Sequence, residues 1–133
     1  MVTSPLDRYY HALDAGDDDE AAAAFAEDAV YIRPATDPGR DVRGMEVIRG
    51  RTAIREFFAR RRERQEHGEY SHRHDLRAVA VDGSQCFVEA LMVTDEGPVG
   101  VFLAHATVGD DGLIERYIAV FTETPGGFDA VPG

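Results

Sequence analysis

Residues 70–123 read YSHRHDLRAVAVDGSQCFVEALMVTDEGPVGVFLAHATVGDDGLIERYIAVFTE. β-type residues form runs near 70–81, 85–94, 99–108 and 113–123 of this stretch. Turn signals separate the runs, as Asp-Gly at 82–83, DEGP at 95–98 and GDDG at 109–112. Consecutive strands joined by short turns predict a curved, antiparallel sheet.

Upstream of this sheet the sequence predicts helices. The stretch SPLD at 4–7 supplies a capping Ser, a Pro at the first helical position and an acid three residues after the cap. Apolar residues then recur at helical spacing up to Leu13, and Gly16 ends the helix. A second helix is expected over 17–25, with acidic residues at its positive end. A third, capped by Thr52, carries Ile54, Phe57 and Phe58 on one side.

The segment between the second and third helices is less regular. Val30, Tyr31 and Ile32 form a short predicted strand, which Pro34 stops. Residues 35–49 show no periodicity and are predicted to be a loop near the mouth of a pocket. Because helices precede a run of strands, we expect a single α+β domain over residues 1–133.

The composition limits the partners that the protein can bind and the reactions that it can catalyse. The net charge of −11, from 25 acidic and 14 basic residues, argues against nucleic acid or an anionic membrane as partner. The absence of Lys excludes Schiff-base catalysis. The lone Cys86 excludes an internal disulfide and a cysteine-cluster metal site. No apolar run has the length of a membrane span or follows a basic N-terminus, so we expect a cytoplasmic protein.

Local motifs resemble those of one superfamily, in the same order and spacing. They are RYY at 8–10 with LDAGD at 13–17, FAEDAV at 25–30, GRTAIREF at 50–57 and DGLI at 111–114. The chain resembles the ketosteroid isomerase and SnoaL-like superfamily, also called nuclear transport factor two-like. The resemblance implies a cone, in which a curved sheet packs on three N-terminal helices and encloses a hydrophobic pocket. It also implies a homodimer formed through the other sheet face, and a hydrophobic carbonyl compound as ligand.

The resemblance argues against the steroid isomerase reaction itself. That reaction uses a Tyr on the first helix, an Asp base before the Pro of the first strand and a protonated Asp on a later strand. Here these positions fall on Tyr9, Arg33 and Ala104. An Arg is no proton-abstracting carboxylate, and an Ala donates nothing.

The residues that replace the missing acids suggest another proton-transfer site. The catalytic candidates are Tyr9, Arg33, Glu89 and His74. Arg33 would hold a carboxylate or an enolate, Tyr9 would donate to a carbonyl, and Glu89 or His74 would be the acid or base. Strand alternation, together with the alignment that the resemblance implies, leads us to expect Phe87, Glu89 and Leu91 to point inward, as do Tyr117, Ala119 and Phe121. The expected ligand-binding residues are Tyr31, Phe58, Phe87, Leu91, Phe102, Tyr117 and Phe121.

Structural roles for the same residues stay open. Arg33 and Glu89 would also make sense as a buried ion pair, and Tyr9 as a core residue with a satisfied hydroxyl. One strand register puts His72 and His74 in the pocket, and the other puts Ser71 and Arg73 there. A one-residue bulge would likewise exchange Ala104 and His105.

The first functional hypothesis is a cofactor-independent enzyme that isomerises, cyclises or dehydrates a hydrophobic carbonyl compound. The alternative is a non-catalytic module that binds a small ligand or another protein, because one fold serves both classes. No metal is expected, since no His and carboxylate spacing converges in the sequence. An inward acid or imidazole with a shifted pKa would favour the enzyme.

Overall fold

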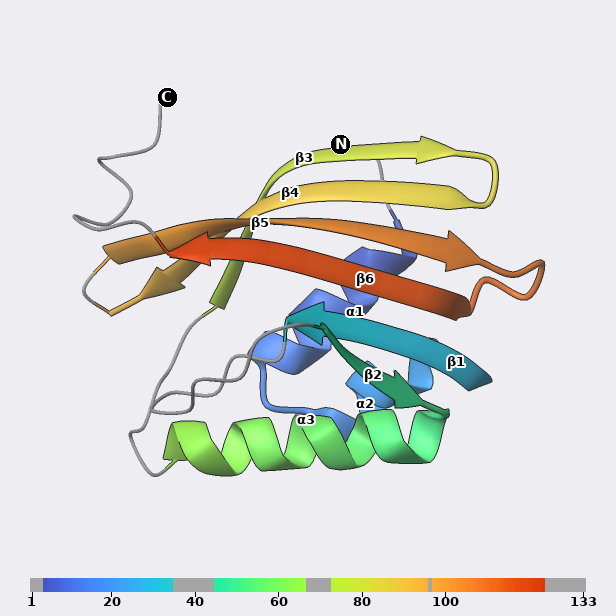
Figure 1. Cartoon of the computed structure of the whole chain (residues 1–133), viewed down its shortest axis with the longest axis horizontal. Helices are drawn as coiled ribbons and strands as arrows, with labels where there is room; N and C mark the ends of the chain where they lie inside the picture. Colours follow the sequence, from blue (N-terminus) through green and yellow to red (C-terminus); the bar gives the residue numbers. More distant parts are fainter. Residues whose placement is uncertain (1–3, 35–44, 67–72, 96, 124–133) are drawn as a thin grey trace.

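The computed structural model describes residues 4–34, 45–66, 73–95 and 97–123. Within these ranges three helices lie on one side of a six-stranded sheet (Figure 1). The helices are α1 (Pro5–Asp14), α2 (Asp18–Ala23) and α3 (Arg51–Glu66). The strands are β1 (Phe25–Pro34), β2 (Met45–Arg49), β3 (Arg73–Asp82), β4 (Gln85–Thr94), β5 (Gly97–Val108) and β6 (Ile114–Glu123). The α+β class, with helices that precede a run of strands, is confirmed.

The sheet is mixed, whereas the sequence predicted an antiparallel one. Its strand order is β2-β1-β6-β5-β4-β3, and β1 pairs with β6 in parallel. The other neighbours are antiparallel, in agreement with the predicted hairpins. In the parallel pair Tyr31 lies opposite Tyr117. Because these two residues are far apart in the sequence, no local turn signal could have predicted that their strands pair.

Element boundaries differ from the prediction around β1 and at the start of α3, where Thr52, the predicted cap, is already the second helical residue. The second helix ends at Ala23, and Phe25 already belongs to β1, which is therefore longer than the predicted strand. The segment 45–49, predicted as loop, is β2 and pairs with β1. Gly50, at φ 89°, then makes the tight connection to α3 that few other residues allow. The rest of the predicted loop, residues 35–44, lies outside the described part of the chain.

The helices cover one face of the sheet. α1 contacts β3 at one end of the strand order, while α3 contacts β1 and β2 at the other end. A sheet whose two ends both reach the helix layer must curve around it, as Figure 1 shows. The start of α1 is fixed as predicted, since Leu6 N–H donates to Ser4 Oγ at 3.1 Å and Ser4 N–H donates to Asp7 Oδ2 at 2.9 Å. Among the described helices, none has the length and apolar character needed to cross a bilayer.

Candidate functional site

Aromatic rings fill the space between the helices and strands β1 and β6. Tyr9 of α1 lies at the centre with 1% of its surface exposed. Its ring stacks on Phe58 of α3 at 5.4 Å and meets Tyr117 of β6 edge-on at 5.3 Å. Phe25 and Tyr31 of β1 lie 5.1 and 6.2 Å from the same ring. The interior is therefore apolar in bulk, but it holds several hydroxyl groups.

The tyrosine hydroxyls form two short pairs. Tyr9 and Tyr31 share a hydrogen bond of 2.6 Å, and Tyr10 and Tyr117 share one of 2.7 Å. The two pairs are adjacent, because the rings of Tyr31 and Tyr117 stack at 4.7 Å. Burial raises the pKa of Tyr9, Tyr10 and Tyr117 well above the usual value near 10. These hydroxyls therefore keep their protons and remain hydrogen-bond donors at physiological pH.

A histidine and a carboxylate lie beside the second tyrosine pair. His74 of β3 places its Nδ1 2.7 Å from Asp14 Oδ1, and its backbone N–H donates to Asp14 Oδ2 at 2.9 Å. The imidazole stacks on Tyr10 at 5.0 Å and meets Phe102 edge-on at 5.2 Å. Only 9% of the His74 side chain is exposed. Asp14, at the end of α1, thus fixes the orientation of a buried imidazole.

The environment keeps His74 neutral near pH 7. Burial lowers the pKa of His74 from its usual value near 6.5, and the charge of Arg61 acts in the same direction, whereas Asp14 opposes both. Since a carboxylate oxygen accepts only, the Nδ1 that faces Asp14 carries the proton of the neutral ring. Nε2 then holds the lone pair, which is the arrangement of a general base.

Arg61 is a charged residue of this interior that the sequence did not single out. It is 8% exposed and is one turn beyond Phe58 on α3. Its charge acts to lower the pKa of the Tyr9 hydroxyl as well as that of His74. In the sequence Arg61 belongs to a run of charges at 60–66 that is typical of a solvated helix end. Only the spacing from Ile54 and Phe58 would have indicated a buried position.

Most of the predicted interior residues lie where they were expected. Tyr9, Tyr31, Phe58, Phe102 and Tyr117 are buried on the helix side of the sheet. His74 is also on this side, because the register with β4 pairs it with the buried Met92, while Arg73 is exposed. Of the two registers left open, the structure has the one with His74 inside. Their catalytic and binding roles stay predictions.

The predicted register of β4 is wrong. Phe87 is 50% exposed, and Glu89 and Leu91 share its outward face. The residues that point inward are Cys86, Val88, Ala90 and Met92. The physical reason is volume: aromatic rings from α1, α3, β1 and β6 occupy the interior, which leaves room for smaller side chains on β4. Glu89, Phe87 and Leu91 are therefore not part of the interior site.

Arg33 forms an ion pair with a different residue from the one expected. It lies on the helix side of β1, with its guanidinium 4.9 Å from the centre of the Phe57 ring. Its Nη1 donates to Glu46 Oε2 of β2 at 3.1 Å, so the anticipated pair with Glu89 is wrong. With 18% of its side chain exposed, Arg33 is at the edge of the interior and already holds a carboxylate.

The remaining candidates fall outside the interior or outside the described residues. His105 is on the outer face of β5, where Nε2 lies 2.6 Å from Gln85 Oε1 and the ring contacts Phe87 at 4.8 Å. Its neighbour Ala104 points inward, as the isomerase alignment implied. His72 and the side chain of Phe121 lie outside the part of the chain that the structure describes.

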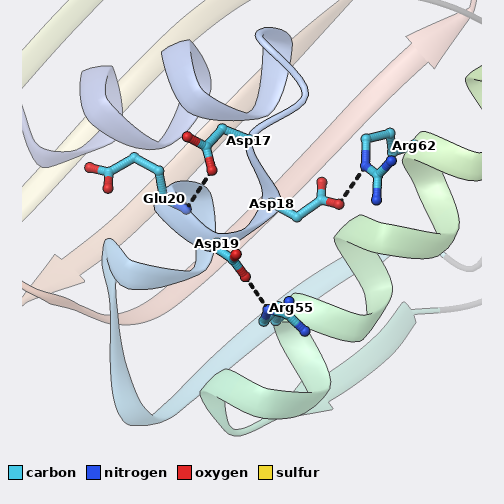
Figure 2. A network of polar contacts seen from close by, with 6 residues as sticks. All are labelled: Asp17, Asp18, Asp19, Glu20, Arg55 and Arg62. Carbon is cyan, nitrogen blue, oxygen red and sulfur yellow. Dashed lines mark hydrogen bonds and ion pairs between the residues drawn. The ribbon is translucent and has the colours of Figure 1, made fainter.

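A second polar cluster joins α2 to α3. Figure 2 shows Asp18 and Asp19 of α2 reaching Arg62 and Arg55 of α3, with a distance of 2.6 Å from Asp18 Oδ2 to Arg62 Nε. An open hollow of about 300 Å³ lies between these side chains. Each of the four charges has an opposite partner, so the cluster is a clamp between two helices. Among the described residues, no group of His, Cys, Asp and Glu has a geometry that would hold a metal ion.

Comparison with known proteins identifies the family. The profile of the SnoaL-like domain matches residues 6–117. The chain belongs to the SnoaL-like family. No curated protein matches this SnoaL-like chain in sequence.

Solved structures of the same fold carry several functional names. A candidate SnoaL-like isomerase from Agrobacterium tumefaciens is 14% identical, with a TM-score of 0.67 over 89% of this chain and 94% of that one. A candidate polyketide cyclase from Sinorhizobium meliloti is 22% identical, with a TM-score of 0.63 over 89% and 94%. A candidate ketosteroid isomerase from Kribbella flavida is 22% identical, with a TM-score of 0.64 over 97% and 86%. At these identities the likeness shows the fold alone.

Proposed function

We propose that this SnoaL-like protein is a cofactor-independent enzyme that moves a proton on a hydrophobic carbonyl compound, in an isomerisation, a cyclisation or a dehydration. The observation that supports this most is the largely buried imidazole of His74, which bonds to Asp14 near the surface and stacks on Tyr10, whose hydroxyl pairs with that of Tyr117. An imidazole with a lowered pKa inside an aromatic interior is typical of a general base. The steroid isomerase reaction in its usual form is not proposed, because Arg33 and Ala104 replace its two acids.

The polar roles in this proposal belong to His74, Asp14 and the pair of Tyr10 and Tyr117. His74 Nε2 takes a proton from the carbon next to the carbonyl, while Asp14 stabilises the imidazolium that forms. A protonated tyrosine hydroxyl, from Tyr10 or Tyr117, donates a hydrogen bond to the enolate oxygen. The imidazolium then returns the proton to another carbon in an isomerisation, or to a departing hydroxyl in a dehydration. The rings of Phe58 and Phe102 would provide apolar walls for the substrate.

One observation favours the second candidate function, a non-catalytic module that binds a hydrophobic small ligand. Among the described residues, no buried side-chain nitrogen or oxygen lacks a hydrogen-bond partner. The tyrosines bond to each other and His74 bonds to Asp14, which also suits a purely structural network. A binding module of this kind would take up a ligand without any proton transfer.

The test is the exchange of carbon-bound protons. The protein is incubated in D₂O with 2-tetralone, an apolar ketone with acidic C–H bonds, and its proton signals are followed by NMR. We expect exchange well above the buffer rate. The rate should rise with pH through a midpoint below 6.5 and then level off, because only neutral His74 accepts a proton and its folded pKa is lowered. Binding of 2-tetralone with exchange only at the buffer rate would favour the binding module.

We also propose that a second copy of the chain covers the outer face of the sheet. Leu103 of β5 and Val120 of β6 are directly opposite each other and are 55% and 47% exposed, with Phe87 of β4 beside them. Large apolar side chains grouped on one face are typical of an interaction surface. A homodimer would place the same face of both copies in contact.

Sedimentation velocity of wild type and Leu103→Glu tests this proposal. Wild type should sediment as a dimer, and the variant as a folded monomer, because an unpaired charge in an apolar interface is costly. Thr52→Glu, a change at an exposed position of α3, is the control and should stay dimeric. A monomeric wild type across the accessible concentration range would contradict the proposal.

A further inference from the structure

The outer face of the sheet places an acid among apolar side chains. Two neighbouring rows of residues cross β4, β5 and β6 on this face, since residues that pair across strands point to the same side. Glu89 is partly buried and stands opposite the exposed Leu103. A second copy that covers this face therefore takes the Glu89 carboxylate out of water. The rows are Phe87, His105 and Ile118, and, two residues away on each strand, Glu89, Leu103 and Val120.

A carboxylate that is covered in this way needs a cation. Removal of an ionised carboxylate from water is costly unless an opposite charge compensates it. Within the described part of the chain, Glu89 forms no ion pair. Arg77, adjacent to it in the pairing of β3 with β4, has an interaction of its own. The cation for Glu89 is therefore sought on the second copy.

Arg116 of β6 is a cation on the same face. It is exposed and, like Glu89, forms no ion pair with the residues that the structure describes. Glu89 lies opposite Leu103, two residues before His105 on β5. Arg116 lies opposite Thr107, two residues after His105. Because β4 and β6 flank β5 on opposite sides, His105 is midway between the two charges.

A two-fold axis makes this arrangement complementary to itself. In an isologous interface the same surface of both copies is in contact. We consider an axis in the plane of the sheet that passes through His105, at right angles to the line from Glu89 to Arg116. It sets Glu89 of each copy against Arg116 of the other. With strands ~4.8 Å apart and ~6.8 Å for two residues, each charge is about 8 Å from His105. Packed sheets are about 10 Å apart, a gap that a Glu and an Arg side chain span together.

We propose that two Glu89–Arg116 ion pairs, each formed between the two copies, determine how the outer faces meet in the dimer. This inference rests on the proposed homodimer and is independent of the proposed enzyme function. The self-complementary charges favour a second copy of this chain over another protein as the occupant of the face. Such pairs fix the orientation of the partners and disfavour other arrangements, in which like charges or unpaired charges would meet.

Charge reversal tests the pairing, by sedimentation velocity of the full chain. Glu89→Arg leaves only cations at the two positions, and Arg116→Glu leaves only anions. Each variant alone should therefore dimerise at least about tenfold more weakly than wild type. Mixed in equal amounts, the two variants should form a dimer about as tight as that of wild type, because every cation then faces an anion. The double variant Glu89→Arg/Arg116→Glu should regain the dimer for the same reason.

The controls are the same reversals elsewhere. Glu56→Arg and Arg60→Glu change exposed residues of α3, in the helix layer, and should dimerise like wild type. The double variant keeps one charge of each sign in every copy, so it remains a test if a single variant does not fold.

Some results would overturn the proposal. They are single variants that dimerise like wild type, single variants that stay monomeric when mixed, and a folded double variant that is monomeric. If wild type is a dimer, such a result removes only the ion pairs. A monomeric wild type removes the homodimer together with them.

Discussion

His74→Gln is expected to lower the protein-catalysed exchange of 2-tetralone by about 10²- to 10⁴-fold, the usual contribution of a positioned general base. Glutamine has a similar size and keeps a donor for Asp14, but its amide accepts no proton near neutral pH. The loss should appear in kcat more than in KM, because the imidazole acts in the step that breaks the C–H bond. The measurement is the exchange rate by NMR at saturating and at low ketone concentrations.

His105→Gln is the matched control for this prediction. His105 is on the outer face of the sheet and contacts Gln85 and Phe87, so the same substitution there leaves the interior unchanged. Its exchange rate should equal that of wild type. A folded His74→Gln protein that exchanges 2-tetralone as fast as wild type would remove His74 from the mechanism. Circular dichroism and the unfolding midpoint show whether each variant is folded.

The sequence predicted those features of the fold that local chemistry determines. The capping box of Ser4 and Asp7 defines the start of α1 through neighbouring residues alone. The turn around Gly83, at φ 59°, joins β3 to β4 where Asp82-Gly83 indicated a hairpin. Each of these signals lies within a few residues of the structure that it specifies. The order of helices and strands could therefore be predicted without any knowledge of long-range contacts.

The candidate site depended on contacts that local patterns do not contain. Asp14 and His74 are 60 positions apart, and neither stands in a motif that links it to the other. Arg61 is buried by its place on α3, although its neighbours in sequence are charged. His74 was a candidate, but its partner Asp14 and the burial of Arg61 were missed, because the surroundings of a polar group are decided by tertiary packing rather than by the residue and its nearest neighbours.

The error on β4 has a similar origin. A strand that is apolar on both faces, such as QCFVEALMVT, fits either register by its alternation pattern. Strand alternation and the alignment with the superfamily placed Phe87, Glu89 and Leu91 inside. The volume already filled by Tyr9, Phe25, Phe58 and other rings selects the smaller set instead. The register of such a strand depends on the volume of the whole core, and the sequence of the strand alone does not contain that information.

The observed register of β4 predicts how much stability the protein loses when Phe58 or Phe87 is replaced. Phe58→Ala should lower the free energy of unfolding by about 3–5 kcal/mol, because Phe58 is fully buried and a cavity would replace a ring stacked on Tyr9. Phe87→Ala should cost less than about 1 kcal/mol, because half of that side chain already contacts water. Urea denaturation gives both values, and a typical domain stability of about 5–15 kcal/mol leaves room to measure them.

The comparison is made in the Leu103→Glu background, so that contacts between copies do not add to the cost of losing Phe87. Under the register predicted from the sequence, Phe87 would be a core residue and its removal would cost about as much as that of Phe58. Similar losses for the two variants would therefore contradict the observed register and bring Glu89 back to the interior as a candidate acid. A large loss for Phe58→Ala with a small one for Phe87→Ala would leave His74 as the acid–base candidate of the interior.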